Sequence, residues 1–152
     1  MSQAELPRAA RRVREALAAA GVDAEIVVLE DSTRTAPEAA AAVGCELGAI
    51  VKTLVFRRSG DGSPVLVLVS GANRADEAAL GVERADASFV REVTGYAIGG
   101  IPPVGHATPL ETLVDPDLMA FGEVWCAAGT PNTLFGIAPA ELVRITGGRV
   151  LG

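Results

Sequence analysis

The chain has 152 residues, of which 49% are hydrophobic and 21% charged, and this composition fits one soluble globular domain. Its formal net charge is −6, whereas proteins that grip long stretches of nucleic acid usually present a basic surface. The balance of charge therefore disfavours a general nucleic-acid binder, but it leaves room for a protein that contacts only the end of a nucleic acid.

The sequence carries no sign of export. The N-terminal residues lack the apolar segment of a secretory signal, and no apolar run reaches the roughly 18 residues that a membrane span requires. Cys45 and Cys126 are far apart in the sequence, and we expect both to be free thiols. We therefore expect a cytoplasmic protein with no membrane partner.

Two helices and a short strand are predicted before the first long apolar run. Apolar residues recur at helical spacing from Pro7 to Ala20, and Gly21 can end this helix in the left-handed conformation. A short strand is expected over Ala24–Leu29. The segment Thr35–Glu38 offers a capping hydroxyl followed by Pro and Glu, so a second helix should run to Gly44.

A β-hairpin follows. The apolar segments Ile50–Phe56 and Val65–Val69 flank the turn Gly60–Ser63, which is typical of two antiparallel strands. The second segment is continuously apolar, so we expect both of its faces to be covered.

The rest of the chain alternates irregularly between short helices and strands. This alternation, together with the hairpin, favours an α+β fold with a twisted, mixed and largely antiparallel sheet flanked by helices. No repeat or linker divides the chain, so residues 1–152 should form a single compact domain. The expected helices are 74–80, 86–93, 116–120 and 139–147, and the expected strands are 96–98, 110–114, 123–128 and 133–137.

Lys52 is the only lysine in the chain. In an extended strand it shares a face with Leu54 and Phe56, so its ammonium could lie at the mouth of an apolar pocket. There it could bind a phosphate, a carbonyl or a terminal ribose. The alternative is a lysine whose stem covers the core while its ammonium stays in water.

The segment Gly95–His106 is dense in glycine and proline. The adjacent Gly99 and Gly100 allow the backbone to approach a ligand closely, and successive N–H groups could bind a carbonyl or an oxyanion. A tight connection between two elements would explain the same composition. His106, the only histidine, could act as a base or a substrate contact, or it could be a surface or capping group.

Other polar residues follow predicted strands. Ser70 and Asn73 come directly after the buried strand and could line a pocket or cap the next helix. Gly129 and Thr130 stand in a turn that could place a hydroxyl beside the same pocket. One histidine and two distant cysteines form no zinc motif, and no serine-hydrolase elbow, P-loop or dinucleotide-binding motif is present. A metal or cofactor is therefore not expected.

Taken together, these segments resemble the YbaK/EbsC family, which includes the editing domain of bacterial prolyl-tRNA synthetases and its free-standing relatives. The resemblance covers nearly the whole chain and is most specific in Gly95–His106. Its landmarks are Val51-Lys52-Thr53-Leu54, the strand Val65–Val69 ending in Ser70-Gly71, the glycine- and proline-rich segment, and Gly129 before a last strand and helix.

The resemblance implies an aminoacyl-tRNA hydrolase with the family's α+β fold. It would cleave the ester between an amino acid and the terminal ribose of tRNA without a metal, and in several relatives a ribose hydroxyl is thought to assist water. The implied catalytic residues are Lys52, Gly99 and Gly100. The implied substrate-binding residues are Ile101, Pro103, His106, Ser70, Asn73, Gly129 and Thr130.

We therefore expect a trans-editing deacylase that acts on the acceptor end of a mischarged tRNA. The expected substrate is a small amino acid on tRNA-Pro or a similar tRNA, and an aminoacyl-tRNA synthetase is a candidate partner. Relatives that act on cysteinyl-tRNA carry a serine before the turn, where this chain has Cys126-Ala127-Ala128. Two alternatives stay open, namely a non-catalytic module that binds tRNA or a synthetase, and a small-molecule hydrolase. Candidate phosphate contacts are Arg57, Arg58, Arg74 and Arg91.

Overall fold

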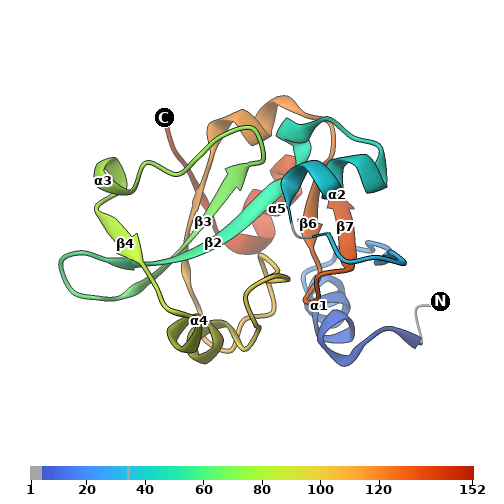
Figure 1. Ribbon diagram of the computed structural model, residues 1–152, viewed down its shortest axis with the longest axis horizontal. Helices are drawn as coiled ribbons and strands as arrows, with labels where there is room; N and C mark the ends of the chain where they lie inside the picture. The colour runs from blue at the N-terminus through green and yellow to red at the C-terminus, as the bar shows by residue number, and fades with distance from the viewer. Residues whose placement is uncertain (1–4, 34) are drawn as a thin grey trace.

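The strands of the chain form two sheets, with helices packed around them (Figure 1). The computed structural model describes residues 5–33 and 35–152. The helices are α1 (Arg8–Ala19), α2 (Ala36–Val43), α3 (Glu77–Leu80), α4 (Ala87–Thr94) and α5 (Pro139–Thr146), with 3₁₀ turns η2 (Leu47–Ala49) and η3 (Pro116–Ala120). The strands are β1 (Val27–Val28), β2 (Val51–Arg58), β3 (Pro64–Ser70), β4 (Val82–Arg84), β5 (Glu111–Val114), β6 (Val124–Ala127), β7 (Thr133–Ile137) and β8 (Arg149–Val150).

The larger sheet has the strand order β4-β2-β3-β5-β8. In it β2 is antiparallel to β3 and β4, whereas β5 is parallel to β3 and β8. The smaller sheet, β1-β7-β6, is antiparallel throughout. A parallel bridge between Ile50 and Trp125 links the two sheets at the start of β2. The predicted α+β fold with mixed, largely antiparallel pairing is confirmed, and its strands are divided between two sheets.

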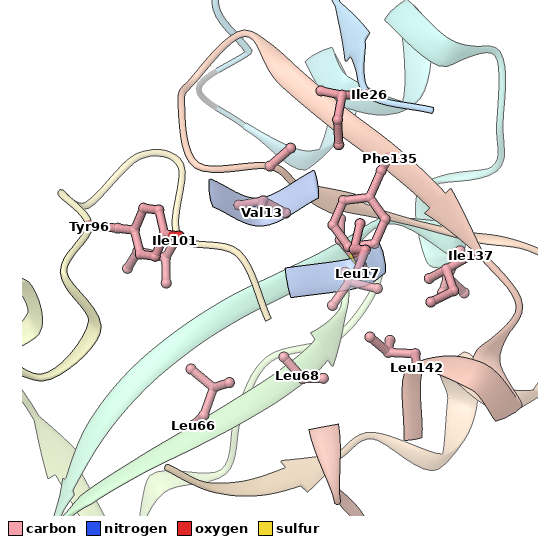
Figure 2. Close-up of a cluster of buried hydrophobic side chains, with 14 of the residues drawn as sticks. Val13, Leu17, Ile26, Leu66, Leu68, Tyr96, Ile101, Phe135, Ile137 and Leu142 are labelled. Carbon is pink, nitrogen blue, oxygen red and sulfur yellow. The ribbon is translucent and has the colours of Figure 1, made fainter. Parts of the chain in front are cut away.

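The strand β3 is buried on both faces, as its continuous apolar sequence predicted. Leu66 and Leu68 face the main core, while Val65, Val67 and Val69 face a second cluster with Phe56 and Val82. In Figure 2 the two leucines lie below side chains from α1 and β7, and a side chain from α5 lies beside them. These labelled partners are Val13, Leu17, Phe135, Ile137 and Leu142.

Side-chain caps and glycines fix the ends of the helices. The Thr35 hydroxyl accepts a hydrogen bond from the Glu38 N–H at the start of α2, as the sequence predicted. The Asp86 carboxylate accepts a hydrogen bond from the Phe89 N–H at 2.8 Å at the start of α4. Gly44 and Gly95 end these two helices in the left-handed conformation.

Three predicted elements differ in the structure. Residues 96–98 are not a strand, because Gly95 is left-handed and the Thr94 hydroxyl accepts a hydrogen bond from the Tyr96 N–H, which turns the chain. The helix expected over 74–80 begins only at Glu77, since the Asp76 carboxylate caps the Ala79 N–H. The strand expected over 24–29 pairs only through Val27–Val28.

The short edge strands β4 and β8 were not predicted, because two or three paired residues leave little periodicity to detect. None of the helices in residues 5–33 and 35–152 combines the length and the apolarity needed to cross a bilayer.

Candidate functional site

A cavity of about 820 Å³ follows β2 from its start to Phe56. The edge strand β4 pairs with β2 only over Phe56–Arg58, so residues 51–55 have no strand partner on that edge within the described chain. The segment 98–101, helix α2 and the smaller sheet contribute the remaining walls. An open strand edge beside a loop is a surface that an extended ligand can approach.

The cavity wall has an apolar part and a charged part. The apolar part comes from both sheets, from α4 and from the loop, and it includes Ile50, Leu54, Phe56, Val90, Ile98, Ile101, Trp125 and Leu134. The charged part holds Lys52, Arg74, Glu77 and Arg84. Thr33, Thr35 and Thr53 add hydroxyl groups. A ligand with an uncharged end and an anionic end would match this division.

Lys52 alternates with its neighbours along β2 and so shares a strand face with Leu54 and Phe56. All residues from 51 to 56 line the cavity. Its side chain is half-buried, and its ammonium donates a hydrogen bond to the Asn73 carbonyl oxygen. Burial lowers the pKa of Lys52, Arg74 lowers it further, and Asp115 opposes both. The ammonium is therefore neither in the core nor free in solvent.

Behind Lys52, a hydrogen-bond network joins the ends of β3 and β5. The Asn73 side-chain amide donates to Asp115 at 2.9 Å and to Asp117 at 2.7 Å. Asp115 also accepts hydrogen bonds from the backbone N–H groups of Ser70 and Asp117. Burial opposes ionisation of Asp115, but these hydrogen bonds outweigh it, and the pKa of Asp115 falls below its usual range.

The hydroxyl of Ser70 forms hydrogen bonds with the neighbouring backbone. Ser70 is 1% exposed, its hydroxyl donates to the Gly48 carbonyl oxygen at 2.7 Å, and it accepts a hydrogen bond from the Ala72 N–H. Ser70 therefore ties η2 to the end of β3 and does not line the cavity.

The loop residues Gly99, Gly100 and Ile101 reach the cavity. Gly99 has φ +105°, and a Cβ added to Gly100 would lie 2.6–2.8 Å from backbone atoms of Thr130. The carbonyl oxygen of Gly100 accepts a hydrogen bond from the Gly129 N–H at 2.8 Å. The turn at Gly129 and Thr130 therefore supports the loop from behind, and only glycine fits at position 100 without displacing it.

In the described part of the chain, the N–H groups of Gly99 and Gly100 donate to no backbone carbonyl. Both are candidate donors to a ligand, with Gly99 exposed and Gly100 buried. Preorganised backbone donors of this kind can stabilise a developing negative charge.

His106 supports the same loop from inside. Its Nε2 donates a hydrogen bond to the Pro102 carbonyl oxygen at 2.7 Å, and the neighbouring Pro103 is buried. Burial lowers the pKa of His106, and the hydrogen bond to Pro102 only partly opposes this effect. Burial therefore favours the neutral imidazole, whose Nε2–H is directed at the Pro102 carbonyl oxygen.

The structure brings only some of the predicted site residues to one cavity. Lys52, Gly99, Gly100 and Ile101 line it. Ser70, Asn73, Pro103, His106, Gly129 and Thr130 lie behind its wall, and their contact with a substrate stays a prediction. The sequence interpretation missed Asp115, Arg84 and Trp125. Asp115 could have been found from the sequence. It directly follows β5, Ser70 ends β3, and residues at the carboxyl ends of adjacent parallel strands meet at one sheet edge.

The thiols and most of the candidate arginines have other environments. Burial raises the pKa of Cys126, which packs in the core, and the pKa of the partly exposed Cys45 is also raised by burial. Arg58 pairs with Glu111 at 3.2 Å from its Nε, and Arg57 lies over the Phe89 ring. Arg74 is the one of the four candidate arginines that lines the cavity. Among the described residues, no group of three or more His, Cys, Asp or Glu side chains could hold a metal ion.

The chain matches the sequence model of the aminoacyl-tRNA editing domain over residues 30–145. It is 31% identical over 132 residues to the uncharacterized protein YwhH of Bacillus subtilis (strain 168), covering 83% of each chain. It is 26% identical over 122 residues to the "Putative Cys-tRNA(Pro)/Cys-tRNA(Cys) deacylase EbsC" of Enterococcus faecalis (strain ATCC 700802 / V583), covering 76% of this chain and 74% of that relative.

Solved structures with the same fold cover nearly the whole chain. One is described as a putative trans-editing enzyme for prolyl tRNA synthetase, with 49% identity, a TM-score of 0.90 and coverage of 97% of both chains. Another, the hypothetical protein APE2540, is 34% identical with a TM-score of 0.81 and covers 91% of this chain and 96% of that one. The likeness in fold therefore extends over nearly the whole chain.

Proposed function

This chain belongs to the aminoacyl-tRNA editing domain family, and from that premise we propose that it hydrolyses the ester of a mischarged tRNA. The proposed substrate carries a small, uncharged amino acid on tRNA-Pro or a similar tRNA. The similarity to a structure described as "a putative trans-editing enzyme for prolyl tRNA synthetase" supports the choice of tRNA.

One observation carries the proposal. Lys52, Gly99 and Gly100 line a single cavity that also has an apolar wall, and the N–H groups of the two glycines donate to no backbone carbonyl in the described part of the chain. An aminoacyl ester joins an uncharged side chain to a ribose and a phosphodiester. The divided wall can hold the side chain near Ile101 and the anionic end near Lys52 and Arg74.

The proposed reaction consumes one water. Its oxygen forms a bond to the ester carbonyl carbon, and the carbonyl oxygen becomes negatively charged in the tetrahedral intermediate. In this proposal the Gly99 and Gly100 N–H groups donate to that oxygen. The carbon–oxygen bond to the ribose then breaks, the ribose oxygen takes a proton, and the products are a free amino acid and an uncharged tRNA.

The cavity wall offers no cysteine, serine or histidine among its described residues. Water activated in the substrate complex is therefore a simpler route than a covalent acyl-enzyme, and the substrate's own ribose hydroxyl can assist it. Lys52 would bind the ribose or phosphate end and stabilise developing charge, because an ammonium in a half-buried site acts more strongly than one in bulk water.

The proposal is tested with a panel of tRNAs charged correctly and incorrectly with labelled amino acids. We expect one or a few small-residue mischarged species to be cleared. We also expect Lys52→Ala to lower kcat/KM by about 10²-fold or more, as removing one transition-state donor does. Arg149→Ala, an exposed change in β8, is the matched control and should keep the wild-type rate.

Each outcome selects one function. If every charged tRNA survives but binds the wild-type protein, the chain is a non-catalytic tRNA-binding module and hydrolysis is refuted. If a simple aminoacyl ester is cleaved as fast as the tRNA substrate, the chain is a small-molecule hydrolase. If Lys52→Ala keeps its rate, the assigned role of Lys52 is wrong.

A further inference from the structure

The structure assigns Asp115 and Asn73 as positioning residues that hold the Lys52 ammonium at the cavity, an inference that rests on the proposed function. The three groups form one chain of contacts: Lys52 donates to the Asn73 carbonyl oxygen, and the Asn73 side chain donates to Asp115. Neither Asp115 nor Asn73 lines the cavity, so both act through Lys52.

Hydrogen bonds hold both the side chain and the backbone of Asn73 in place. Its side-chain amide donates to Asp115 and Asp117, which use up both of its N–H groups. Its N–H donates to the Ser70 carbonyl oxygen at 2.9 Å, so its backbone is anchored to the end of β3. The carbonyl that receives Lys52 therefore cannot rotate freely, and one of the three ammonium protons has a fixed direction.

Asp115 is itself fixed by the fold. It follows β5, whose parallel pairing with β3 continues in a hydrogen bond from the Asp115 N–H to the Leu68 carbonyl oxygen at 2.8 Å. Its carboxylate also accepts the Ser70 N–H at 3.0 Å. The negative charge near Lys52 is thus held by the larger sheet, not by a mobile side chain.

The charges around Lys52 explain why such a partner is needed. Arg74 lies beside it, and Arg84 adds a second guanidinium to the cavity wall, while Glu77 supplies an opposing charge there. Asp117 lies behind Asn73. Burial and Arg74 both disfavour the ammonium, and Asp115 favours it. Removing the Asp115 charge should therefore lower the pKa of Lys52 further.

The test measures Lys52 directly. Because Lys52 is the only lysine, lysine labelled with ¹³C at Cε gives a single side-chain NMR signal whose pH titration needs no assignment. We expect Asp115→Asn to move this titration to lower pH, and Asn73→Ala, which keeps the Asp115 charge, to move it less. Asp23→Asn, a change at an exposed residue after α1, should leave it at the wild-type position.

Activity supplies a second reading. We expect kcat to fall by about 10- to 100-fold in Asp115→Asn and Asn73→Ala with little change in KM, because misplacing a reacting group by about 1 Å costs this much. The alkaline limit of kcat should move to lower pH in Asp115→Asn. In a Lys52→Arg background that shift should vanish, because arginine does not titrate in this range.

The results separate this inference from the proposed function. An unchanged lysine titration together with an unchanged kcat in Asp115→Asn overturns the positioning role, provided that thermal unfolding shows the variant to be folded. If the wild-type protein hydrolyses no charged tRNA, the proposed function fails, whereas the NMR titration still decides whether Asp115 holds the Lys52 charge.

Discussion

At the scale of single residues, the site depends on polar groups whose neighbours fix both their direction and their charge. Lys52 is aimed by the Asn73 carbonyl oxygen, and His106 is aimed by the Pro102 carbonyl oxygen. Both groups have a lowered pKa because burial penalises their charged forms. Lys52 meets the ligand cavity, whereas His106 holds the loop that forms one wall of it.

The His106 environment predicts how stability depends on pH. The folded-state pKa lies below the unfolded value, so the unfolded chain binds the proton more readily, and stability should fall as pH drops below about 6.5. His106→Gln keeps an N–H donor for Pro102 but does not titrate. We expect the wild type to lose more unfolding free energy than this variant between pH 7.5 and pH 5.5, measured by urea denaturation.

Equal losses in the two proteins would show that other groups account for the acid sensitivity. The activity of His106→Gln at pH 7.5 gives a separate check, since a residue that only supports the loop should tolerate an isosteric donor. A loss as large as that of Lys52→Ala would instead place His106 in contact with the substrate.

At the scale of secondary-structure elements, the decisive unit is the loop that follows α4. The left-handed Gly95 ends the helix, and the next residues turn back toward the cavity without forming a strand. The turn at Gly129, between β6 and β7, then packs against Gly100. Two connections far apart in sequence therefore form the proposed donor site together.

This packing predicts the effect of one added methyl group. In Gly100→Ala the new Cβ would lie 2.6 Å from the Thr130 carbonyl carbon, so the loop or the turn must shift. We expect a loss of about 1–3 kcal/mol in unfolding free energy and, because the donors move, a fall of about 10²-fold in kcat. Denaturant unfolding and single-turnover hydrolysis measure the two effects.

Gly122→Ala is the matched control, because a Cβ at this glycine has no neighbour within 4 Å and its φ is not left-handed. It should keep both stability and rate. If Gly100→Ala kept the stability and rate of this control, the close packing of the loop on the Thr130 backbone would matter neither for folding nor for hydrolysis.

At the scale of the whole molecule, the acidic net charge limits how the protein can hold tRNA. The net charge is −6, and Arg57 and Arg58 are already in contact with Phe89 and Glu111, so few cations remain near the cavity among residues 5–33 and 35–152. Arg74 and Arg84 on the wall are the clearest candidates. The proposed substrate would then be held through its acceptor end, with one or two phosphate contacts.

One or two phosphate contacts predict that kcat/KM depends only weakly on salt concentration. For about two phosphate contacts, kcat/KM on tRNA at subsaturating substrate should fall only about tenfold between 50 and 200 mM salt. Arg74→Gln should make the slope shallower by about one contact, whereas Arg144→Gln, on the exposed part of α5, should not change it. If kcat/KM fell by about 10³-fold over this salt range, a larger basic surface elsewhere on the protein would have to contact the tRNA.

Much of the fold followed from the sequence alone. Continuous burial of β3 was readable from five adjacent apolar residues, and the cap of α2 from Thr35, because such signals are local. Lys52, Leu54 and Phe56 were placed on one face by the period of a strand. The family followed from the order of these landmarks together with the Gly95–His106 segment.

Only the tertiary structure decided which residues share the cavity. The Ser70 hydroxyl and the His106 imidazole donate to backbone carbonyl oxygens, and Asp115 meets Asn73. Residue types and spacing do not fix the direction of a side chain, so the sequence did not predict these contacts. The parallel pairing of β3 with β5 brings Asp115 to Asn73, although 42 positions separate them. Long-range strand pairing and the packing of one loop on another are set by the whole core, so no local pattern encodes them.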